Sequence, residues 1–208
     1  MTPRIGVLAY GSLIQRPGDE LLEAEVERRS GARTPFRVEF ARSSNERDGA
    51  PTLIPVDAGG AHVEATVIVL RDGTSLEQAR DMVYRREINA VGDLERSYRP
   101  DSSKSNQVYV EALPGFAGLD WVLYTRIFPN IDGLTPNRLA DLAIKSAQGV
   151  ARKNGRDGIS YLRDALLNGI RTPLSDAYRE AILQRTDATS LDEALEKVGA
   201  NSGDPDST

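Results

Sequence analysis

The sequence contains no cysteine and only one histidine, His62. The absence of cysteine excludes disulfide bonds, thiolate nucleophiles and cysteine-bound zinc. A single histidine leaves few metal sites, and a histidine-centred catalytic triad would have to use His62. Because His62 stands at the start of a predicted strand, we expect it to be structural or exposed. Catalysis, if present, must then depend on carboxylates, tyrosines, hydroxyls, arginines and backbone amides.

Long apolar runs and strong charge are also absent. No apolar stretch is long enough to span a membrane, and residues 1–14 lack a positively charged flank followed by a cleavage site. The net charge of −5 is small and argues against nucleic acid as the partner. Arginines gather from Arg28 to Arg47, but glutamates are interleaved with them, which indicates a solvated surface of mixed charge. We expect a cytoplasmic protein without a membrane partner; the sequence gives no indication of its oligomeric state.

The first half of the chain has the pattern of a sheet with one inserted helix. The predicted strands are Arg4–Ala9, Pro35–Arg42, His62–Leu70, Gln107–Leu113 and Asp120–Ile127. The helix follows Asp72-Gly73 and runs to about Val91, before Gly92. Thr74 or Ser75 can cap it, with Glu77 or Gln78 completing a capping box. The polar stretch 93–106 has no periodicity, which is typical of a lid or a disordered excursion.

The second half is predicted to be helical. Thr135-Pro136 and Thr172-Pro173 each place a cap and a first-turn proline before an apolar pattern. Between them Gly158–Leu167 is a short helix, and Ser190-x-x-Glu193 opens a last helix that ends before Gly199. The predicted fold class is α+β, with a mixed, barrel-like sheet, a crossing helix and C-terminal helices. We expect one domain over residues 1–199, with the sheet in about 1–130, the helices in about 131–199 and a flexible tail at 200–208.

One motif near the N-terminus has the form of a strand that breaks into a tight turn. The run from Ile5 to Ala9 is apolar and is followed by Tyr10, Gly11, Ser12 and Leu13. A glycine there lets the backbone approach a ligand closely, and successive N–H groups in such a turn can converge on an anion. Most strand-Gly-Ser segments are only turns, so this motif alone does not indicate a site. Further segments along the chain, described below, support the interpretation.

The second candidate is Glu87, in the segment Tyr84-Arg85-Arg86-Glu87. At 100° per residue Glu87 falls about 20° from Leu76, at the edge of the buried stripe of the predicted helix. A partly desolvated carboxylate there should have a raised pKa, which suits proton transfer near neutral pH. The alternative is a structural ion pair with Arg80 or Arg86 at the rim of the stripe.

The order of these segments resembles the γ-glutamylcyclotransferase-like (AIG2-like) family. The resemblance covers about Ile5 to Leu167 and is carried by Tyr10–Leu13, the segment Ser43–Leu53 and the helical Glu87. A stretch Gly-x-x-Tyr-Leu at Gly158–Leu162 is similar to one in the helical part of that family. The sequence departs from the family around 93–106 and after Leu174, which affects substrate identity more than fold.

The resemblance implies a catalytic role for Glu87 and a γ-glutamyl site at Tyr10, Gly11, Ser12 and Leu13. Arg47, Tyr98 and Tyr161 are further candidates for substrate binding. In this reaction the α-amine of a γ-glutamyl amide attacks its own δ-carbonyl, which releases 5-oxoproline and an amine. Glu87 would be the general acid and base, and no cofactor, metal or protein nucleophile is required. The expected partner is therefore a small γ-glutamyl compound.

Two other interpretations stay open. Ser12 could be a nucleophile, although the Gly-x-Ser-x-Gly elbow is absent and only His62 could serve as a conventional base. The same cavity could instead belong to a non-catalytic module that binds a small molecule or peptide. Such a module would keep the turn and Arg47 but would not need a protonatable Glu87.

Overall fold

The computed structural model describes residues 2–101 and 107–200, which divide into two compact units. Unit 1 consists of Met1–Pro35 and His62–Phe128, and unit 2 consists of Phe36–Ala61 and Pro129–Thr208. The predicted tail at 201–208 and part of the predicted lid, 102–106, lie outside the described residues. Two compact units can belong to one domain, so the single domain stays a prediction.

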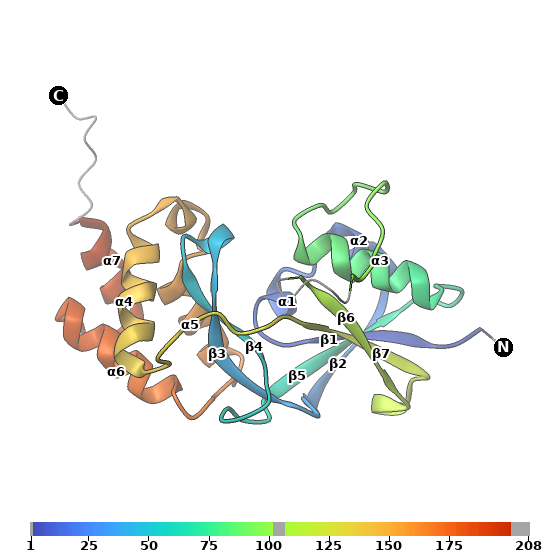
Figure 1. Ribbon diagram of the computed structural model, residues 1–208, viewed down its shortest axis with the longest axis horizontal. Coiled ribbons are helices and arrows are strands. Elements are labelled where there is room, and N and C mark those ends of the chain that lie inside the picture. Colours follow the sequence, from blue (N-terminus) through green and yellow to red (C-terminus); the bar gives the residue numbers. More distant parts are fainter. Residues whose placement is uncertain (1, 102–106, 201–208) are drawn as a thin grey trace. The chain divides into compact units, whose positions relative to one another are not determined.

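Unit 1 is built on a mixed five-stranded sheet in the order β2-β5-β1-β7-β6 (Figure 1). Its central strand β1 is antiparallel to β5 and parallel to β7. The strand bounds are Ile5–Ala9 (β1), Glu25–Arg33 (β2), Glu64–Leu70 (β5), Tyr109–Pro114 (β6) and Trp121–Arg126 (β7). The α+β class and the mixed sheet are therefore confirmed.

The expected barrel-like closure is wrong. The sheet is open, with β2 and β6 at its two edges and no ladder between them in the described part of the chain. The strands β3 (Arg37–Ser44) and β4 (Ala50–Val56) pair with each other in a separate two-stranded sheet. These two strands are therefore not members of the five-stranded sheet.

Strand β2 was not predicted, because its residues were interpreted as a solvated surface of mixed charge. Most of its side chains are indeed exposed, and Arg28 and Arg29 pair with Glu25 and Glu27. Its backbone nevertheless pairs with β5, with register shifts between Glu25 and Glu27 and between Arg29 and Ala32. Charged side chains and bulges are common on edge strands, where they discourage pairing with another chain. Apolar alternation, the signal used to predict strands, is therefore missing here.

Helix α3 (Leu76–Glu87) begins as predicted and ends one turn early. Ser75 is its N-cap and forms a capping box with Gln78, which confirms that prediction. The helix stops before Asn89, which takes a left-handed conformation at φ 52°, and Ala90 donates to the carbonyl of Arg85. Asparagine tolerates this conformation, so Asn89 ends the helix before Gly92 can.

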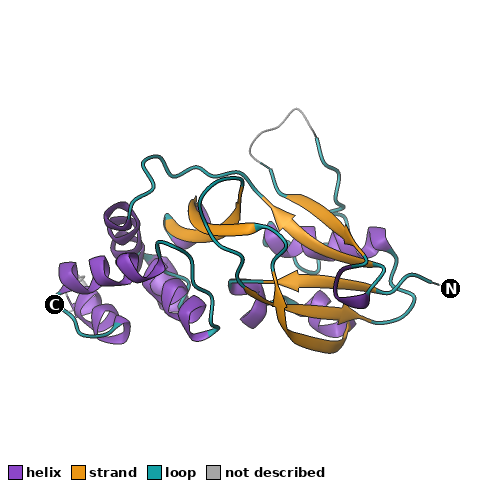
Figure 2. Ribbon diagram, turned by 90° about the horizontal axis from the view of Figure 1, so that it is seen from below, coloured by secondary structure: helices purple, strands orange, loops and turns teal. Residues whose placement is uncertain are grey.

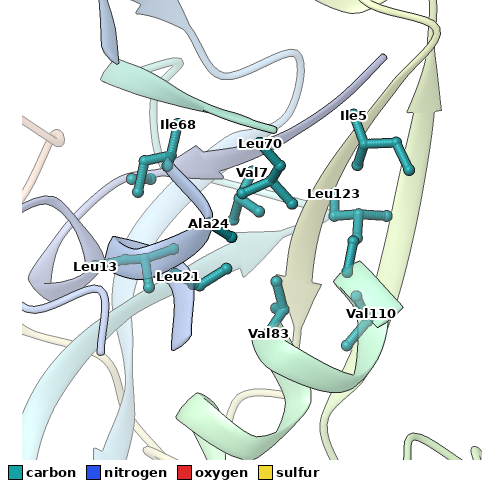
Figure 3. Close-up of a cluster of buried hydrophobic side chains, with 12 residues drawn as sticks. Ile5, Val7, Leu13, Leu21, Ala24, Ile68, Leu70, Val83, Val110 and Leu123 are labelled. Carbon is teal, nitrogen blue, oxygen red and sulfur yellow. The ribbon is translucent and has the colours of Figure 1, made fainter. Parts of the chain in front are cut away.

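One face of the sheet in unit 1 is covered by α3 and by two short helices, α1 (Ser12–Gln15) and α2 (Asp19–Ala24). Figure 3 shows the apolar side chains that meet there. They come from β1, β5, β6, β7 and the three helices: Ile5, Val7, Ala9, Leu13, Leu21, Ala24, Ile68, Leu70, Ala79, Val83, Val110 and Leu123. This core fixes the end of β1 and the last turns of α3, where the candidate residues Gly11 and Glu87 lie.

In unit 2 the β3–β4 hairpin packs against helices α4 (Pro136–Ala147) and α5 (Gly158–Leu167). Helices α6 (Ser175–Thr186) and α7 (Leu191–Ala200) pack against those two helices and against each other (Figure 2). The short 3-10 helices are η1 (Asn45–Arg47), η2 (Phe116–Gly118) and η3 (Val150–Asn154), of which η2 belongs to unit 1. Gly158 permits close packing, since a Cβ there would lie 2.6 Å from the Cα of Ala143.

The predicted helix starts have mixed outcomes. The cap by Thr135 with Pro136 at the first turn is confirmed, and the bounds of α5 are those predicted. The start at Thr172-Pro173 is wrong, because the Thr172 hydroxyl donates to the buried Glu39 carboxylate and α6 begins at Ser175. Helix α7 continues to Ala200 and does not stop before Gly199. Within the described ranges, no helix has the length and apolar character needed to span a membrane.

Candidate functional site

The turn after β1 requires its glycine. Gly11 has φ 67° and ψ −137°, a conformation that is strained for residues with a Cβ. The turn leads directly into α1, whose buried Leu13 anchors it in the core. The Tyr10 hydroxyl donates to the carbonyl of Thr125 on β7, which fixes the other side of the turn. Ser12 and Leu13 stand in the first turn of α1, where N–H groups have no acceptor within the helix.

Glu87 is the last residue of α3. Its side chain is 24% exposed, whereas Ala79 and Val83 of the same helix are fully buried. The Glu87 carboxylate accepts a hydrogen bond from Arg86, with 2.6 Å between Nη1 and Oε1. The ion pair with a neighbouring arginine, which the sequence left open between Arg80 and Arg86, is therefore present with Arg86.

The guanidinium of Arg86 links Glu87 to the turn. Its Nη2 lies 3.0 Å from Ser12 Oγ and 3.0 Å from the carbonyl oxygen of Arg16. Its Nε lies 3.1 Å from the same carbonyl oxygen. One cation thus contacts the Ser12 hydroxyl and the Glu87 carboxylate at the same time. The side chains of Ser12 and Glu87, 75 residues apart in sequence, are brought to one guanidinium in unit 1.

Sequence reasoning considered Arg86 only as a partner for Glu87 and missed its contact with Ser12. The helical period places Arg86 about 20° from Ala79, at the opposite edge of the buried stripe from Glu87, and this does not reveal which side chain Arg86 contacts. The contact depends on α1 lying beside the end of α3. A short helix of four residues gives little signal in sequence, so this link could be found only in the structure.

The adjacent Arg85 forms a second, separate network. Its guanidinium binds the Glu20 carboxylate of α2, with Nε 2.9 Å from Oε1, and Nη2 also contacts Oε2. Arg85 further donates to the carbonyl of Arg96, and Glu20 accepts from the amide of Gly92. The hydrogen bonds from Arg85 lower the pKa of Glu20, and the Gly92 amide acts in the same direction. This network joins α2, α3 and the start of the following loop.

Tyr98 lies in unit 1 and packs against its core. The hydroxyl accepts the amide N–H of Val110, and the ring centroid is 5.7 Å from that of Tyr84. Burial raises the pKa of Tyr98. The backbone amide of Tyr98 donates to Asp81 of α3, so the loop after α3 is tied back to the helix. These contacts give Tyr98 a structural role, and its role in substrate binding stays a prediction.

Arg47 and Tyr161 lie in unit 2 and meet each other there. The guanidinium carbon of Arg47 is 5.0 Å from the ring centroid of Tyr161, within the range of a cation–π contact. The Tyr161 hydroxyl accepts the amide N–H of Leu53, and Arg47 donates to the carbonyl of Arg156. The pairing of these two candidates with each other was not predicted. Their part in a substrate site stays a prediction.

The nucleophile hypothesis for Ser12 finds no base in these contacts. The Ser12 hydroxyl contacts Arg86, a permanent cation that cannot accept its proton. The Nδ1 atom of His62 lies 2.8 Å from the carbonyl oxygen of Thr34, a structural contact between the residue that precedes β5 by two positions and the residue that follows β2. The contacts of Ser12 therefore fit a Glu87-based reaction or a ligand-binding module better than they fit a Ser12 nucleophile.

The described residues contain no group of three or more His, Cys, Asp and Glu side chains that could hold a metal ion. The arrangement that the structure does show is a glycine turn, a cation and a half-buried carboxylate, which suits a ligand with acidic and basic groups. No protein-family model matches this sequence, and no curated protein matches it either.

Proposed function

We propose that the chain is a γ-glutamylcyclotransferase-type enzyme with Glu87 as its general acid and base. The resemblance of Tyr10–Leu13 and Glu87 to that family motivates the proposal. The observation that supports it best is the contact of one guanidinium, that of Arg86, with both Ser12 Oγ and Glu87 Oε1. A turn and a carboxylate that act on one small substrate must lie close enough together for both to contact it. Here Ser12 of the turn and the Glu87 carboxylate both contact the Arg86 side chain.

In the proposed reaction the α-nitrogen of a γ-glutamyl amide forms a bond to Cδ, and the bond from Cδ to the leaving nitrogen breaks. The α-ammonium must lose a proton before it attacks, and the leaving nitrogen must gain one as it departs. Glu87 would accept the first proton and donate the second. The N–H groups of Ser12 and Leu13 would stabilise the oxyanion at the δ-carbonyl. Holding the substrate folded contributes several kcal/mol through proximity.

The test is Glu87→Gln, with Glu77→Gln as the matched control. Both residues lie on α3, but Glu77 is an exposed side chain in the first turn. The glutamine at position 87 keeps the shape but cannot carry a proton, so kcat should fall by about a hundredfold. Release of 5-oxoproline from γ-glutamyl-p-nitroanilide, γ-glutamyl dipeptides and glutathione is followed by mass spectrometry. The Glu77→Gln protein should match the native protein.

Two results would contradict the proposal. If Glu87→Gln releases 5-oxoproline at the native rate, Glu87 has no part in the chemistry. If the native protein binds γ-glutamyl amides but releases no 5-oxoproline from any of them, the non-catalytic binding module replaces the enzyme. Affinity for the intact amides, measured by calorimetry in parallel, separates these two results.

A further inference from the structure

The contacts of Arg86 fall into a fixed set and an exchangeable one. Three donor–acceptor contacts hold the guanidinium to α1 and its C-cap residue, one to Ser12 Oγ and two to the carbonyl oxygen of Arg16. The remaining contact is the ion pair with Glu87. If Glu87 moved away, the three contacts to α1 would still keep Arg86 at the turn. A cation held in this way is a preformed site for another carboxylate.

The ion pair between Arg86 and Glu87 is of the kind that exchanges easily. Adjacent residues on a helix do not face each other, so the backbone restricts the geometry of an ion pair between positions 86 and 87. The Glu87 side chain is a quarter exposed and therefore in contact with water. Ion pairs that are in contact with water contribute little net stability. An incoming carboxylate with better geometry can therefore take the place of Glu87.

We propose that Arg86 is a carboxylate latch, which binds Glu87 in the free protein and the α-carboxylate of the substrate in the complex. The inference rests on the proposed function and specifies its substrate class: a γ-glutamyl compound whose α-carboxylate is free. The three fixed contacts use Nε and Nη2, so the substrate α-carboxylate takes the place of Glu87 on Nη1, as a charge-assisted hydrogen bond. Each exchange replaces one negative charge on Arg86 by another, so the site stays neutral.

The latch connects binding to catalysis. The α-carboxylate and the α-ammonium of a γ-glutamyl group are carried by the same carbon atom. A substrate carboxylate on Arg86 therefore brings the ammonium close to the Glu87 carboxylate that it has displaced. Glu87, released from the arginine, is then the nearest acceptor for the ammonium proton. A compound without the α-carboxylate would leave Glu87 on Arg86 and would not be activated.

The first experiment measures binding and does not depend on turnover. The probes are 5-oxoproline and 2-pyrrolidinone, which differ only by the carboxylate, and binding is followed by NMR chemical-shift changes. The native protein should bind 5-oxoproline at least about thirtyfold more tightly, as expected for a charge-assisted pair. Arg86→Met should remove this preference, and Arg86→Lys should keep part of it, because a lysine retains the charge without the fork. Arg71→Met, at an exposed position outside the site, is the matched control and should bind as the native protein does.

The second experiment measures selectivity in turnover, with γ-glutamyl-p-nitroanilide and 4-aminobutyryl-p-nitroanilide. The second compound has the same amine and carbonyl but lacks the α-carboxylate. In Arg86→Met the ratio of the two kcat/KM values should fall by about thirtyfold. A merely structural role of Arg86 would lower both values alike and leave the ratio unchanged. Circular dichroism of each variant verifies that it is folded.

The outcomes separate the latch from the enzyme. Turnover of γ-glutamyl-p-nitroanilide with an unchanged ratio in Arg86→Met would overturn the latch and leave the proposed function in place. Binding of 5-oxoproline that depends on Arg86, without turnover of any γ-glutamyl amide, would support the latch and overturn the proposed enzyme. Equal binding of 5-oxoproline and 2-pyrrolidinone by the native protein would overturn the latch without any variant.

Discussion

Arg85 and Arg86 stand side by side in the last turn of α3, yet their surroundings differ in kind. The Arg85 side chain is 7% exposed and binds Glu20, a residue on another helix, through several atoms. The Arg86 side chain is 16% exposed, and its acidic partner is the next residue in the chain. Arg85 also donates to a loop carbonyl, so all its contacts join parts of the scaffold.

The difference between the two arginines separates structure from function. A cation whose partner belongs to a distant element stabilises the packing of that element, and removing either partner leaves a buried charge. A cation whose partner is the next, partly exposed residue does not join distant elements through that pair and can exchange it for another anion. We therefore expect the Arg85 network to determine stability and the Arg86 cluster to determine ligand binding. Four variants test this comparison.

The largest effect on stability is expected for Arg85→Met. The substitution leaves the Glu20 carboxylate without its counter-ion and removes the contact with the carbonyl of Arg96. The free energy of unfolding should fall by about 3 kcal/mol. Urea unfolding followed by circular dichroism measures it, with Arg71→Met as the control. If the free energy of unfolding fell by less than about 1 kcal/mol, Arg85 would contribute no more to stability than Arg86 does.

Glu20→Gln should show the pH dependence of the same network. The pKa of Glu20 is lowered by Arg85, so its ionised form adds stability above the pKa of the unfolded chain. At pH 7 the variant should be less stable than the native protein by about 2 kcal/mol, because it loses a hydrogen bond between charged groups. As the pH falls below 4.5 and through the lowered pKa, the native protein should lose this advantage. A difference that stays constant from pH 7 to pH 3 would contradict the ion pair.

Arg86→Met should destabilise the protein by about 1 kcal/mol, from the loss of its hydrogen bonds to α1. In the same urea assay, the free energy of unfolding should therefore fall about three times less than it does in Arg85→Met. Hydrogen exchange at α1 should increase, because Arg86 holds that short helix to α3. An equal loss for the two arginine variants would remove the distinction between them.

The smallest effect on stability is expected for Glu87→Gln, within about 0.5 kcal/mol of the native value. The same substitution at Glu20 costs several times more, although both carboxylates accept from neighbouring arginines of one helix. The pair of variants is thus matched in chemistry and differs in burial and partner. If Glu87→Gln proves as destabilising as Glu20→Gln, Glu87 is part of the scaffold.

Several elements could be predicted because their signals are local. The Ser75 capping box, the Thr135-Pro136 start of α4 and the bounds of α5 depend on a few adjacent residues. The strands β1 and β5 are apolar runs in an otherwise mixed sequence. The early end of α3 at Asn89 and the use of Thr172 to bind Glu39 were missed, since each depends on a contact that local sequence does not reveal.

The sequence by itself determined the α+β class, the absence of thiol chemistry and the two candidates at Gly11 and Glu87. The tertiary structure alone decided that the sheet is open, that β2 is an edge strand and that Arg86 connects Ser12 to Glu87. The physical reason is the range of the interactions. Helix caps and apolar periods act over a few residues, whereas strand order and the contacts of a side chain depend on which distant elements share a core.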